Sequence, residues 1–392
     1  MRIVESYPMR LRIARGRGVW RLLYPVRAVC TLLYGLSLVI RRSSRRSAPH
    51  RNRRLPSTGM QQRAAVVSIG NIEVGGGGKT PLALALGGSV IQGGGRPVVV
   101  TRGYLSEAER ERLPVAVPVS DWHPRETDTE YITARSLLED RTSTGKGPGL
   151  REMARILGDE VVLYRSRGVP VVIDRNRSRG IRLAEELFGP THILLDDAFG
   201  HRHLHKDLDI LLLDATAPFG DGRLVPLGSL REPPQAARRA DCVVFTRDAA
   251  GRIPPGAMPF VTGKPVFFAR HRPAELISRS HERLSLSELT GREVALYSGI
   301  ARPSSFEGLV RELGANVHSS FRFIDHHRYD LRDIEWIASQ VPAGTPFLTT
   351  EKDWAKSAEY FPGTVEIYML RIVMEVDGIE DLLRLIPSRS AS

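Results

Sequence analysis

A run of glycines followed by lysine and threonine is the segment of this chain with the clearest chemical meaning. Glycines allow the backbone to curl so that its N–H groups face phosphate oxygens. In a loop of this type the lysine holds the transferred phosphoryl group and the threonine hydroxyl binds Mg²⁺. The run therefore predicts a P-loop that binds ATP, formed by Glu73, Val74, Gly75, Gly76, Gly77, Gly78, Lys79 and Thr80.

The context of this run decides between a P-loop and a merely flexible turn. The strict P-loop pattern has a glycine six residues before the lysine, and Glu73 occupies that position here. Residues 65–69, however, have the pattern of a buried strand, and a helix is expected over 80–91. A strand before the glycines and a helix after them is the context that a P-loop requires, so we favour the P-loop.

Carboxylates that could complete a magnesium site follow two apolar runs. Asp196 and Asp197 come after residues 192–195, and Asp214 comes after residues 210–213. An acid at the end of a strand can reach Mg²⁺ or its bound water. Two adjacent acids are costly unless a cation neutralises them. We therefore prefer Asp196 and Asp197, with Thr80, as the metal site.

Phosphoryl transfer to an alcohol also needs a residue that accepts the hydroxyl proton. Two segments offer one: Asp159-Glu160, and Asp325-His326-His327. Because acids on loops are usually solvated, spacing alone leaves both segments open.

Strands and helices alternate along most of the chain and would position these residues. After the first strand and helix, a strand is expected over 97–101, which makes a βαβ unit and implies a parallel sheet. Residues 105–150 are polar and predict a long loop with one helix over 126–139. Beyond it we expect strands over 169–173, 193–195, 210–213, 242–245, 293–297 and 346–349, and helices over 179–188, 303–313 and 331–339.

The fold class that follows is α/β, with a P-loop NTPase-type parallel sheet and a second, smaller α/β lobe. Residues 248–264 are rich in Pro and Gly and indicate a boundary. We expect an N-terminal helix and linker over 1–63, a kinase core over 64–255 and a lobe over 256–392 that closes the cleft. The chain has two cysteines among 392 residues, which excludes a disulfide framework.

The net charge of +12 is concentrated at one end of the chain. Residues 1–63 contain 15 arginines and a single acid, Glu5, whereas the remainder is close to neutral. Within 19–40, apolar residues recur at steps of three and four, as on one face of a helix. Their uninterrupted stretch, 28–40, falls short of the roughly 20 residues of a membrane span. We expect an amphipathic helix lying on an anionic membrane, with a core-packed helix as the alternative.

Taken together, these segments resemble the tetraacyldisaccharide 4′-kinase (lipid A kinase) family. The likeness keeps its order over residues 20–356, most of the chain. That family also lacks the first glycine of the P-loop pattern, so Glu73 is expected there. The matching motifs include Ser68-Ile69-Gly70-Asn71, Thr101-Arg102-Gly103-Tyr104, Gly158-Asp159-Glu160, Asp196-Asp197, Leu230-Arg231-Glu232, Asp325-His326-His327 and Thr350-Glu351-Lys352-Asp353.

The resemblance implies a kinase that uses ATP and Mg²⁺ to phosphorylate the 4′-hydroxyl of a tetraacylated glucosamine disaccharide 1-phosphate. It implies Asp159 and His326 as the catalytic pair, Arg177 as a phosphate-site arginine, and Glu232 near the metal. It also implies location at the cytoplasmic face of the inner membrane of a Gram-negative bacterium. The expected partners are the lipid A disaccharide precursor and anionic inner-membrane lipids, with no nucleic acid and no obligatory protein partner.

The chain departs from the family pattern at several points. Asp197 is followed by Ala198-Phe199-Gly200-His201, where the family has glycine, an aromatic residue or leucine, glutamine and histidine. Val161 occupies a position where the family has proline, and residues 105–150 are longer than expected.

Two other functions fit parts of the sequence. A membrane-bound P-loop ATPase acting as a switch is the main alternative, but that class has a second lysine before the glycines, where this chain has Val74. A nucleic-acid-binding protein could use the arginines of 41–54, but that stretch has no aromatic residue for stacking. A requirement for lipid, protein or nucleic acid in ATP turnover would separate the three.

Overall fold

The structure is a computed structural model that describes residues 2–5, 24–43, 64–75, 77–119, 125, 127, 130–141, 149–247 and 251–387. Its strands are β1 (Arg2–Glu5), β2 (Ala65–Gly70), β3 (Pro97–Thr101), β4 (Val115–Val117), β5 (Ile132–Thr133), β6 (Val171–Ile173), β7 (His192–Asp196), β8 (Leu208–Asp214), β9 (Cys242–Thr246), β10 (Val266–Ser278), β11 (Arg283–Leu284), β12 (Glu293–Ser298), β13 (Asn316–Arg322), β14 (Phe347–Thr350) and β15 (Ile367–Val376). Its α-helices are α3 (Tyr24–Ser43), α4 (Lys79–Gln92), α5 (Ala134–Arg141), α6 (Leu150–Leu157), α7 (Asp159–Ser166), α8 (Arg177–Phe188), α9 (Met258–Val261), α10 (Pro303–Glu312), α11 (Leu331–Ser339), α12 (Glu351–Ser357) and α13 (Ile379–Arg384).

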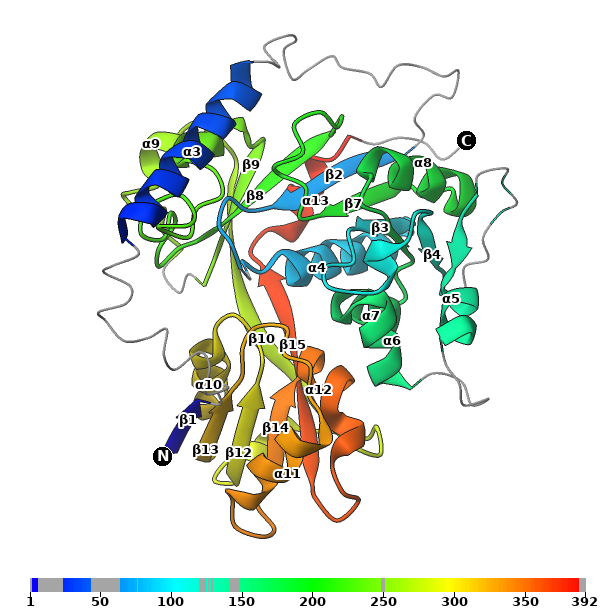
Figure 1. Ribbon diagram of the computed structural model, residues 1–392, viewed down its shortest axis with the longest axis vertical. Coiled ribbons are helices and arrows are strands. Elements are labelled where there is room, and N and C mark those ends of the chain that lie inside the picture. Colours follow the sequence, from blue (N-terminus) through cyan, green and yellow to red (C-terminus); the bar gives the residue numbers. More distant parts are fainter. Residues whose placement is uncertain are drawn as a thin grey trace.

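One large, mostly parallel sheet runs through the whole molecule (Figure 1). Its strands follow the order β1-β13-β12-β14-β15-β10-β9-β8-β2-β7-β3-β6-β4-β5. The pairs β10–β15, β10–β11 and β4–β6 are antiparallel, and the other described pairs are parallel. We call β2 to β9 with their helices the P-loop half, and β10 to β15 with theirs the C-terminal half.

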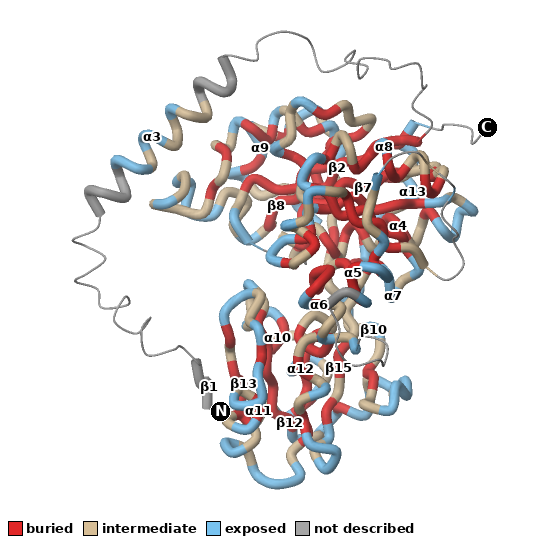
Figure 2. Tube along the Cα trace, turned by 45° about the vertical axis from the view of Figure 1, so that its right-hand side comes forward, coloured by how far each residue is buried: buried red, intermediate tan, exposed pale blue. Residues whose placement is uncertain are grey.

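Helices cover both faces of the sheet in the P-loop half. Alternate residues of β2 point to opposite faces, as the geometry of a strand requires. Val67 packs in the same buried cluster as Leu82 and Leu86 of α4, whereas Val66 packs in the cluster that contains Leu187 of α8. A parallel sheet buried on both faces is the expected α/β arrangement, and Figure 2 shows this buried centre in red.

The β10–β15 pair joins the two halves and was missing from the sequence expectations. The start of β10 pairs in parallel with β9 over Val266–Ala269, and β10 then runs antiparallel to β15 as far as Ser278. Pro273 and several charged residues obscure the strand pattern of β10, and the ladder is irregular between Pro273 and Glu275. The segment expected as a boundary, 248–264, is therefore followed at once by a strand that both halves share.

The elements that the sequence indicated lie close to their expected bounds, with two corrections. Several others were not expected: β4, α6, α7, α9, β11, β13, α12, β15 and α13. The helix expected over 126–139 begins only at Ala134, because Ile132–Thr133 form β5 beside β4. Part of the N-terminal segment is also a strand, since Arg2–Glu5 form β1 on the edge of β13.

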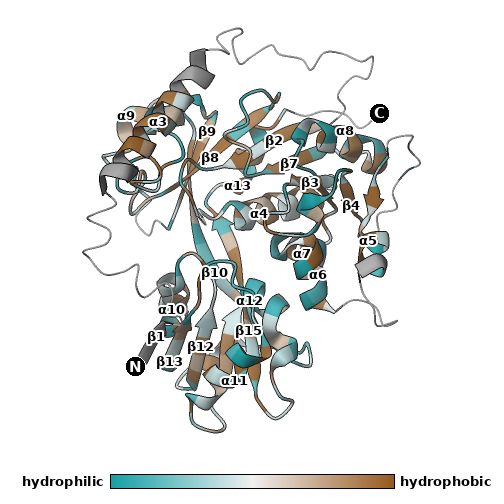
Figure 3. Ribbon diagram, viewed as in Figure 1, coloured by the Kyte–Doolittle hydropathy of each residue, from teal (hydrophilic) through white to brown (hydrophobic). Residues whose placement is uncertain are grey.

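Helix α3 lies beside the P-loop half with an apolar outer face, brown in Figure 3. The exposed fractions of Leu32, Leu33 and Leu36 are 73%, 61% and 55%. Within the described ranges, no helix is both long enough and apolar enough to cross a membrane. The side chains of Arg41 and Arg42, and residues 45–46 altogether, lie outside the described residues.

Candidate active site

The glycine-rich loop leads directly into α4, as a phosphate-binding loop should. Gly75 and Gly78 have φ of 107° and 87°, in the left-handed region that favours glycine, and Gly78 is the N-cap of the helix. The Lys79 ammonium donates to the Asn71 side-chain oxygen at 3.2 Å and to the Gly75 carbonyl at 3.3 Å. Val74 and Gly77 line the same cleft, whereas the Glu73 side chain accepts a hydrogen bond from Ser229. Gly76 lies outside the described residues.

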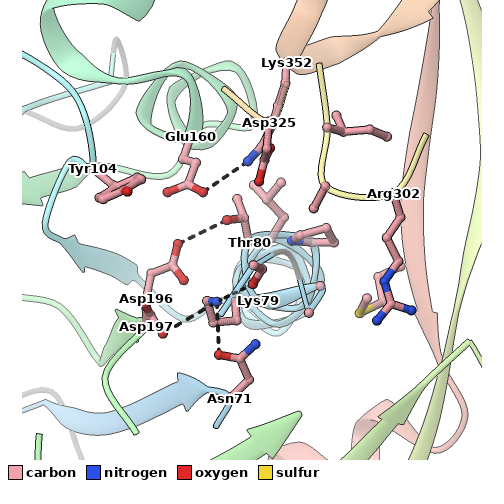
Figure 4. A pocket seen from close by; sticks show the side chains of 18 of the residues that line it. Asn71, Lys79, Thr80, Tyr104, Glu160, Asp196, Asp197, Arg302, Asp325 and Lys352 are labelled. Atoms are coloured by element: carbon pink, nitrogen blue, oxygen red, sulfur yellow. Dashed lines mark hydrogen bonds and ion pairs between the residues drawn. The ribbon is translucent and has the colours of Figure 1, made fainter. Parts of the chain in front are cut away.

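Asp196, at the end of β7, contacts the threonine of this loop. The Thr80 hydroxyl donates to Asp196 Oδ2 at 3.2 Å (Figure 4). The Tyr164 hydroxyl donates to the same oxygen at 2.8 Å. Asp196 is 2% exposed. Burial, together with the nearby charge of Glu160, raises its pKa to about 6. Its second oxygen, Oδ1, is buried and has no hydrogen-bond partner among the described residues.

An orphaned carboxylate oxygen beside a threonine hydroxyl fits a divalent cation. Mg²⁺ typically takes one or two protein oxygens and completes its octahedron with phosphate and water. Within the described residues, no group of three or more His, Cys, Asp or Glu side chains is arranged to hold a metal. The donor set at Thr80 and Asp196 therefore suits a cation that arrives with the nucleotide.

Asp197 turns away from Asp196 and pairs with an arginine. Its φ of 55° is unusual for a non-glycine residue. Arg231 donates to both carboxylate oxygens, at 2.9 and 2.8 Å, and the Lys79 ammonium lies 3.6 Å from Oδ1. Burial opposes ionisation here, but Arg231 and Lys79 outweigh it and lower the pKa of Asp197 to about 2. Asp197 is therefore ionised at neutral pH and holds Lys79 in place.

Asp214, the other candidate strand-end acid, is occupied elsewhere. Its carboxylate accepts from Arg247 at 2.6 Å and from Arg302. Thr80 contacts Asp196 rather than Asp214, which agrees with the preference for the doubled acid.

Glu232 and Arg177 line the cleft in different ways. Both oxygens of Glu232 accept from Arg239, and Oε2 also accepts from Arg202. These two arginines hold Glu232 at the wall of the cleft. Arg177, 4% exposed, donates to the backbone carbonyls of Asp174 and Asp196, at 2.5 and 3.4 Å. Its Nε is buried without a partner in the described part of the chain.

Asp159 and His326 meet across the cleft. Asp159 begins α7 in the P-loop half, and His326 lies in the loop after β13 with a φ of 59°. The His326 Nδ1 atom lies 3.2 Å from Asp159 Oδ2. The hydrogen bond with Asp159 raises the pKa of His326. His327 instead places its Nε2 atom 2.8 Å from Asp333 on α11. The structure thus gives different partners to two adjacent histidines that spacing alone left equivalent.

Two lysines of α12 strengthen the contact between the halves. Lys352 donates to Glu160 at 3.1 Å, and Lys356 lies 3.7 Å from Asp159 Oδ2. Burial opposes ionisation of Asp159, but Lys352, His326 and Lys356 outweigh it and hold its pKa well below the usual range. The adjacent apolar contact joins Ala355 of α12 to Ala154 and Val162 of the P-loop half.

A single cleft of about 1700 Å³ connects these groups. Lys79, Thr80, Asp196, His326 and Lys352 all line it, so the P-loop and His326 face one space. Asp159 lines a smaller pocket that shares His326 with the cleft. Figure 4 shows Lys79, Thr80, Asp196 and Lys352 around this space. The volume exceeds that of most small-molecule sites, which are about 300–1,000 Å³. The cleft therefore has room for a nucleotide and a second, bulky substrate.

Several residues of this site were not assigned by sequence reasoning. Asn71, Arg231 and Lys352 lie within recognised motifs, but no spacing rule gave them a partner. Tyr164 had no signal, because its partner Asp196 comes 32 residues later. Tyr34 of α3 also lines the cleft, although the preferred expectation for the N-terminal helix was membrane binding.

Comparison with known proteins places this arrangement in context. The family model described as Tetraacyldisaccharide-1-P 4′-kinase matches residues 20–126 and 143–389. The tetraacyldisaccharide 4′-kinase of Desulfatibacillum aliphaticivorans is 32% identical, over 81% of this chain and 82% of that protein. The enzyme of the same name from Halothermothrix orenii is 31% identical, over 98% and 97% of the two chains.

A solved structure shares the fold. The "apo" form of LpxK from Aquifex aeolicus in complex with ATP superposes with a TM-score of 0.63 and 26% identity. The match covers 93% of this chain and 97% of that one.

Proposed function

This chain belongs to the tetraacyldisaccharide-1-P 4′-kinase family and is a lipid A 4′-kinase, and we propose how its residues carry the reaction. Lys79 and Thr80 bind the phosphates and metal of Mg-ATP, and Asp159 with His326 accepts the proton of the 4′-hydroxyl. The observation that carries this assignment is the 3.2 Å contact between His326 Nδ1 and Asp159 Oδ2, which orients a histidine that lines the same cleft as the P-loop.

ATP is the phosphoryl donor of the proposed reaction. The solved LpxK relative is described in complex with ATP, and the backbone of residues 73–80 would hold the corresponding phosphates here. Lys79 would balance charge on the transferred group, and Arg177, with its unpaired Nε, would add a second donor. Asn71 and Asp197 keep the lysine ammonium at the loop, which limits its freedom before ATP arrives.

Mg²⁺ would bind between Thr80, Asp196 and the ATP phosphates, with Asp197 nearby. When bound, it neutralises charge on the phosphate oxygens. Asp196 must be ionised for this, and burial raises its pKa only to about 6, so the carboxylate is available at neutral pH.

The orientation of the His326 ring determines which of its nitrogen atoms can act as the general base. With Nδ1 hydrogen-bonded to Asp159, Nε2 is the atom left to accept a proton. As the 4′-oxygen forms its bond to the γ-phosphorus, the hydroxyl proton passes to Nε2 and the bond to the ADP oxygen breaks. Asp159 stabilises the imidazolium that results, and Lys356 and Lys352 keep Asp159 ionised.

We further propose that α3 lies on the cytoplasmic face of the inner membrane of a Gram-negative bacterium. Its exposed leucines would enter the lipid, and the arginines that follow would meet anionic headgroups. The acceptor, the lipid A disaccharide precursor, would reach the cleft from that surface. No nucleic acid and no obligatory protein partner is required by this scheme.

The proposed domain division keeps 1–63 as membrane helix and linker, 64–255 as kinase core and 256–392 as the lobe that supplies His326.

The test of the proposed reaction is mass spectrometry of the tetraacyldisaccharide 1-phosphate incubated with the protein and Mg-ATP. A gain of one phosphate at the 4′ position is expected. ATP turnover that ignores the lipid and responds to a protein partner would instead identify a switch ATPase.

A further inference from the structure

Helix α3 has a second face, opposite its exposed leucines, that docks on the P-loop half. Thr31, Tyr34, Gly35 and Leu38 are spaced as neighbours on one side of a helix and are partly buried, whereas Leu32, Leu33 and Leu36 are exposed. The helix therefore divides its surface between the protein and the proposed membrane.

The docking surface is residues 224–232, which we call the 224–232 segment. The Leu227 N–H donates to the Thr31 hydroxyl at 3.2 Å, and the Tyr34 hydroxyl donates to the Arg231 carbonyl at 2.8 Å. Beside them, a Cβ on Gly35 would lie 3.6 Å from Leu224 Cδ1, so the helix backbone approaches closely.

The opposite edge of the 224–232 segment forms hydrogen bonds with residues 72–74, which lead into the P-loop glycines. The Val74 N–H donates to the Ser229 carbonyl at 2.8 Å, and the Arg231 N–H donates to the Ile72 carbonyl at 2.7 Å. The Ser229 hydroxyl also donates to the Glu73 carboxylate at 3.0 Å. One short stretch of chain thus contacts α3 on one side and residues 72–74 on the other.

The Arg231 side chain extends this connection to the phosphate-binding lysine. Its guanidinium donates to both oxygens of Asp197, to the Asn71 carbonyl at 3.2 Å and to the Asn71 side chain. Asn71 and Asp197 are the two side chains that position Lys79. From Tyr34 to Lys79, every step is a hydrogen bond, a covalent link or an ion pair.

We propose that Tyr34 and Thr31 are positioning residues of the nucleotide site: by docking α3 on the 224–232 segment they hold Arg231, Asn71 and the entrance of the P-loop in their ATP-binding arrangement. The proposal rests on the assignment of the P-loop as the ATP site. It gives the helix a task separate from membrane attachment, because the two tasks use opposite faces.

The test compares ATP affinity in Tyr34→Phe, Thr31→Val and the double variant, using a non-hydrolysable ATP analogue and detergent-solubilised full-length protein. Loss of one hydrogen bond is expected to raise the Kd about two- to thirteenfold, because a hydrogen bond usually contributes about 0.5–1.5 kcal/mol. The KM for ATP should rise with it, with kcat at saturating ATP within about twofold of wild type and vesicle binding unchanged. Thr31→Val is the decisive variant, because Thr31 does not line the cleft.

Tyr368→Phe is the matched control. It removes a tyrosine hydroxyl that is 3.3 Å from the Glu366 carboxylate in the C-terminal half, away from the cleft, and should leave the Kd unchanged. Two results would overturn the proposal: an unaltered Kd in Thr31→Val, whatever Tyr34→Phe does, or a change confined to the KM of the lipid. Failure of the wild-type protein to bind the analogue would instead refute the ATP site itself.

Discussion

His326 Nδ1 lies 3.2 Å from Asp159 Oδ2, although 167 positions separate the two residues in the sequence and they belong to different halves of the sheet. A base assembled in this way exists only while the two sides of the cleft are together. The ion pair between Lys352 and Glu160 and the apolar contact of α12 with α6 and α7 support the same closed arrangement. Proton transfer and the position of the C-terminal half are therefore linked.

If Asp159 and His326 act as a pair, the losses of kcat caused by substituting them should not be additive. His326→Ala and Asp159→Ala should each lower kcat by about 10²–10⁴-fold, since each removes general-base catalysis, and should leave ATP affinity nearly intact. The double variant should be little worse than the worse single one, because the two residues act as a unit. Steady-state kinetics of the three variants measures this. His327→Ala, whose ring pairs with Asp333, is the internal control; multiplying losses, or greater damage at His327, would refute the pair.

The pH dependence of kcat should report the state of His326. The hydrogen bond that His326 donates to Asp159 raises the pKa of His326 above its ordinary value of 6.5, and a base must be neutral to act. The rate should therefore fall as the pH drops through this raised pKa. Asp159→Asn removes the cause, so the acid limb of its kcat profile should move to lower pH, with a lower plateau. An acid limb that stays in place would exclude His326 as the group that titrates.

Lys79→Ala should reduce kcat by about 10²–10⁴-fold, because the lysine charge is most valuable when charge develops on the transferred phosphoryl group. Thr80→Ala should also raise the Mg²⁺ concentration needed for half-maximal rate. Turnover measured over a Mg²⁺ series checks both. Near wild-type turnover in Lys79→Ala would show that residues 73–80 do not form the phosphate site.

Protons and Mg²⁺ should compete at Asp196. Its pKa is raised to about 6, mainly by burial, so below that pH the carboxyl is protonated and cannot bind a cation. Apparent Mg²⁺ affinity should fall about tenfold per pH unit below 6, the limit for one competing proton. Asp197, with a pKa of about 2, adds no competition in this range. Asp196→Asn should bind Mg²⁺ weakly and without this pH dependence; the same slope in that variant would place the titrating group elsewhere.

The outer face of α3 should control membrane binding. Replacing Leu32, Leu33 and Leu36 together by serine should weaken vesicle binding at least tenfold, because burying one leucine is worth about 1.5–3 kcal/mol. A second set of variants replaces by Gln the arginines that follow this face, Arg41, Arg42, Arg45 and Arg46. Each replacement should reduce the free energy of binding to anionic vesicles by about 1 kcal/mol, and by less at high salt. Flotation assays measure both effects. Leu331→Ser, an exposed leucine on α11, is the control, and equal binding by all variants would mean that α3 has a structural task only.

The parts of the fold that sequence reasoning captured are those encoded locally. The strand at 65–69, the glycines and the helix after them are consecutive, and β3 and α11 were expected with the bounds that they have. The contacts that sequence reasoning missed join residues that are far apart in the sequence. Tyr34 and Arg231 are 197 positions apart, and β10 has a pattern broken by Pro273 that makes sense only beside β15. The Asp159–His326 pair came from the family resemblance, because spacing alone left several acids and histidines equivalent.

The shared β10–β15 ribbon also determines the mechanics of the enzyme. A domain on a flexible tether can swing through many orientations, but a two-stranded antiparallel ribbon continuous with the sheet on either side resists bending in its hydrogen-bonded plane. Its softer deformations are a change of twist and a bend out of that plane, so in-plane movements of the C-terminal half are disfavoured. The cleft should therefore open by a hinge at the ribbon, and closure about that hinge brings His326 back beside Asp159.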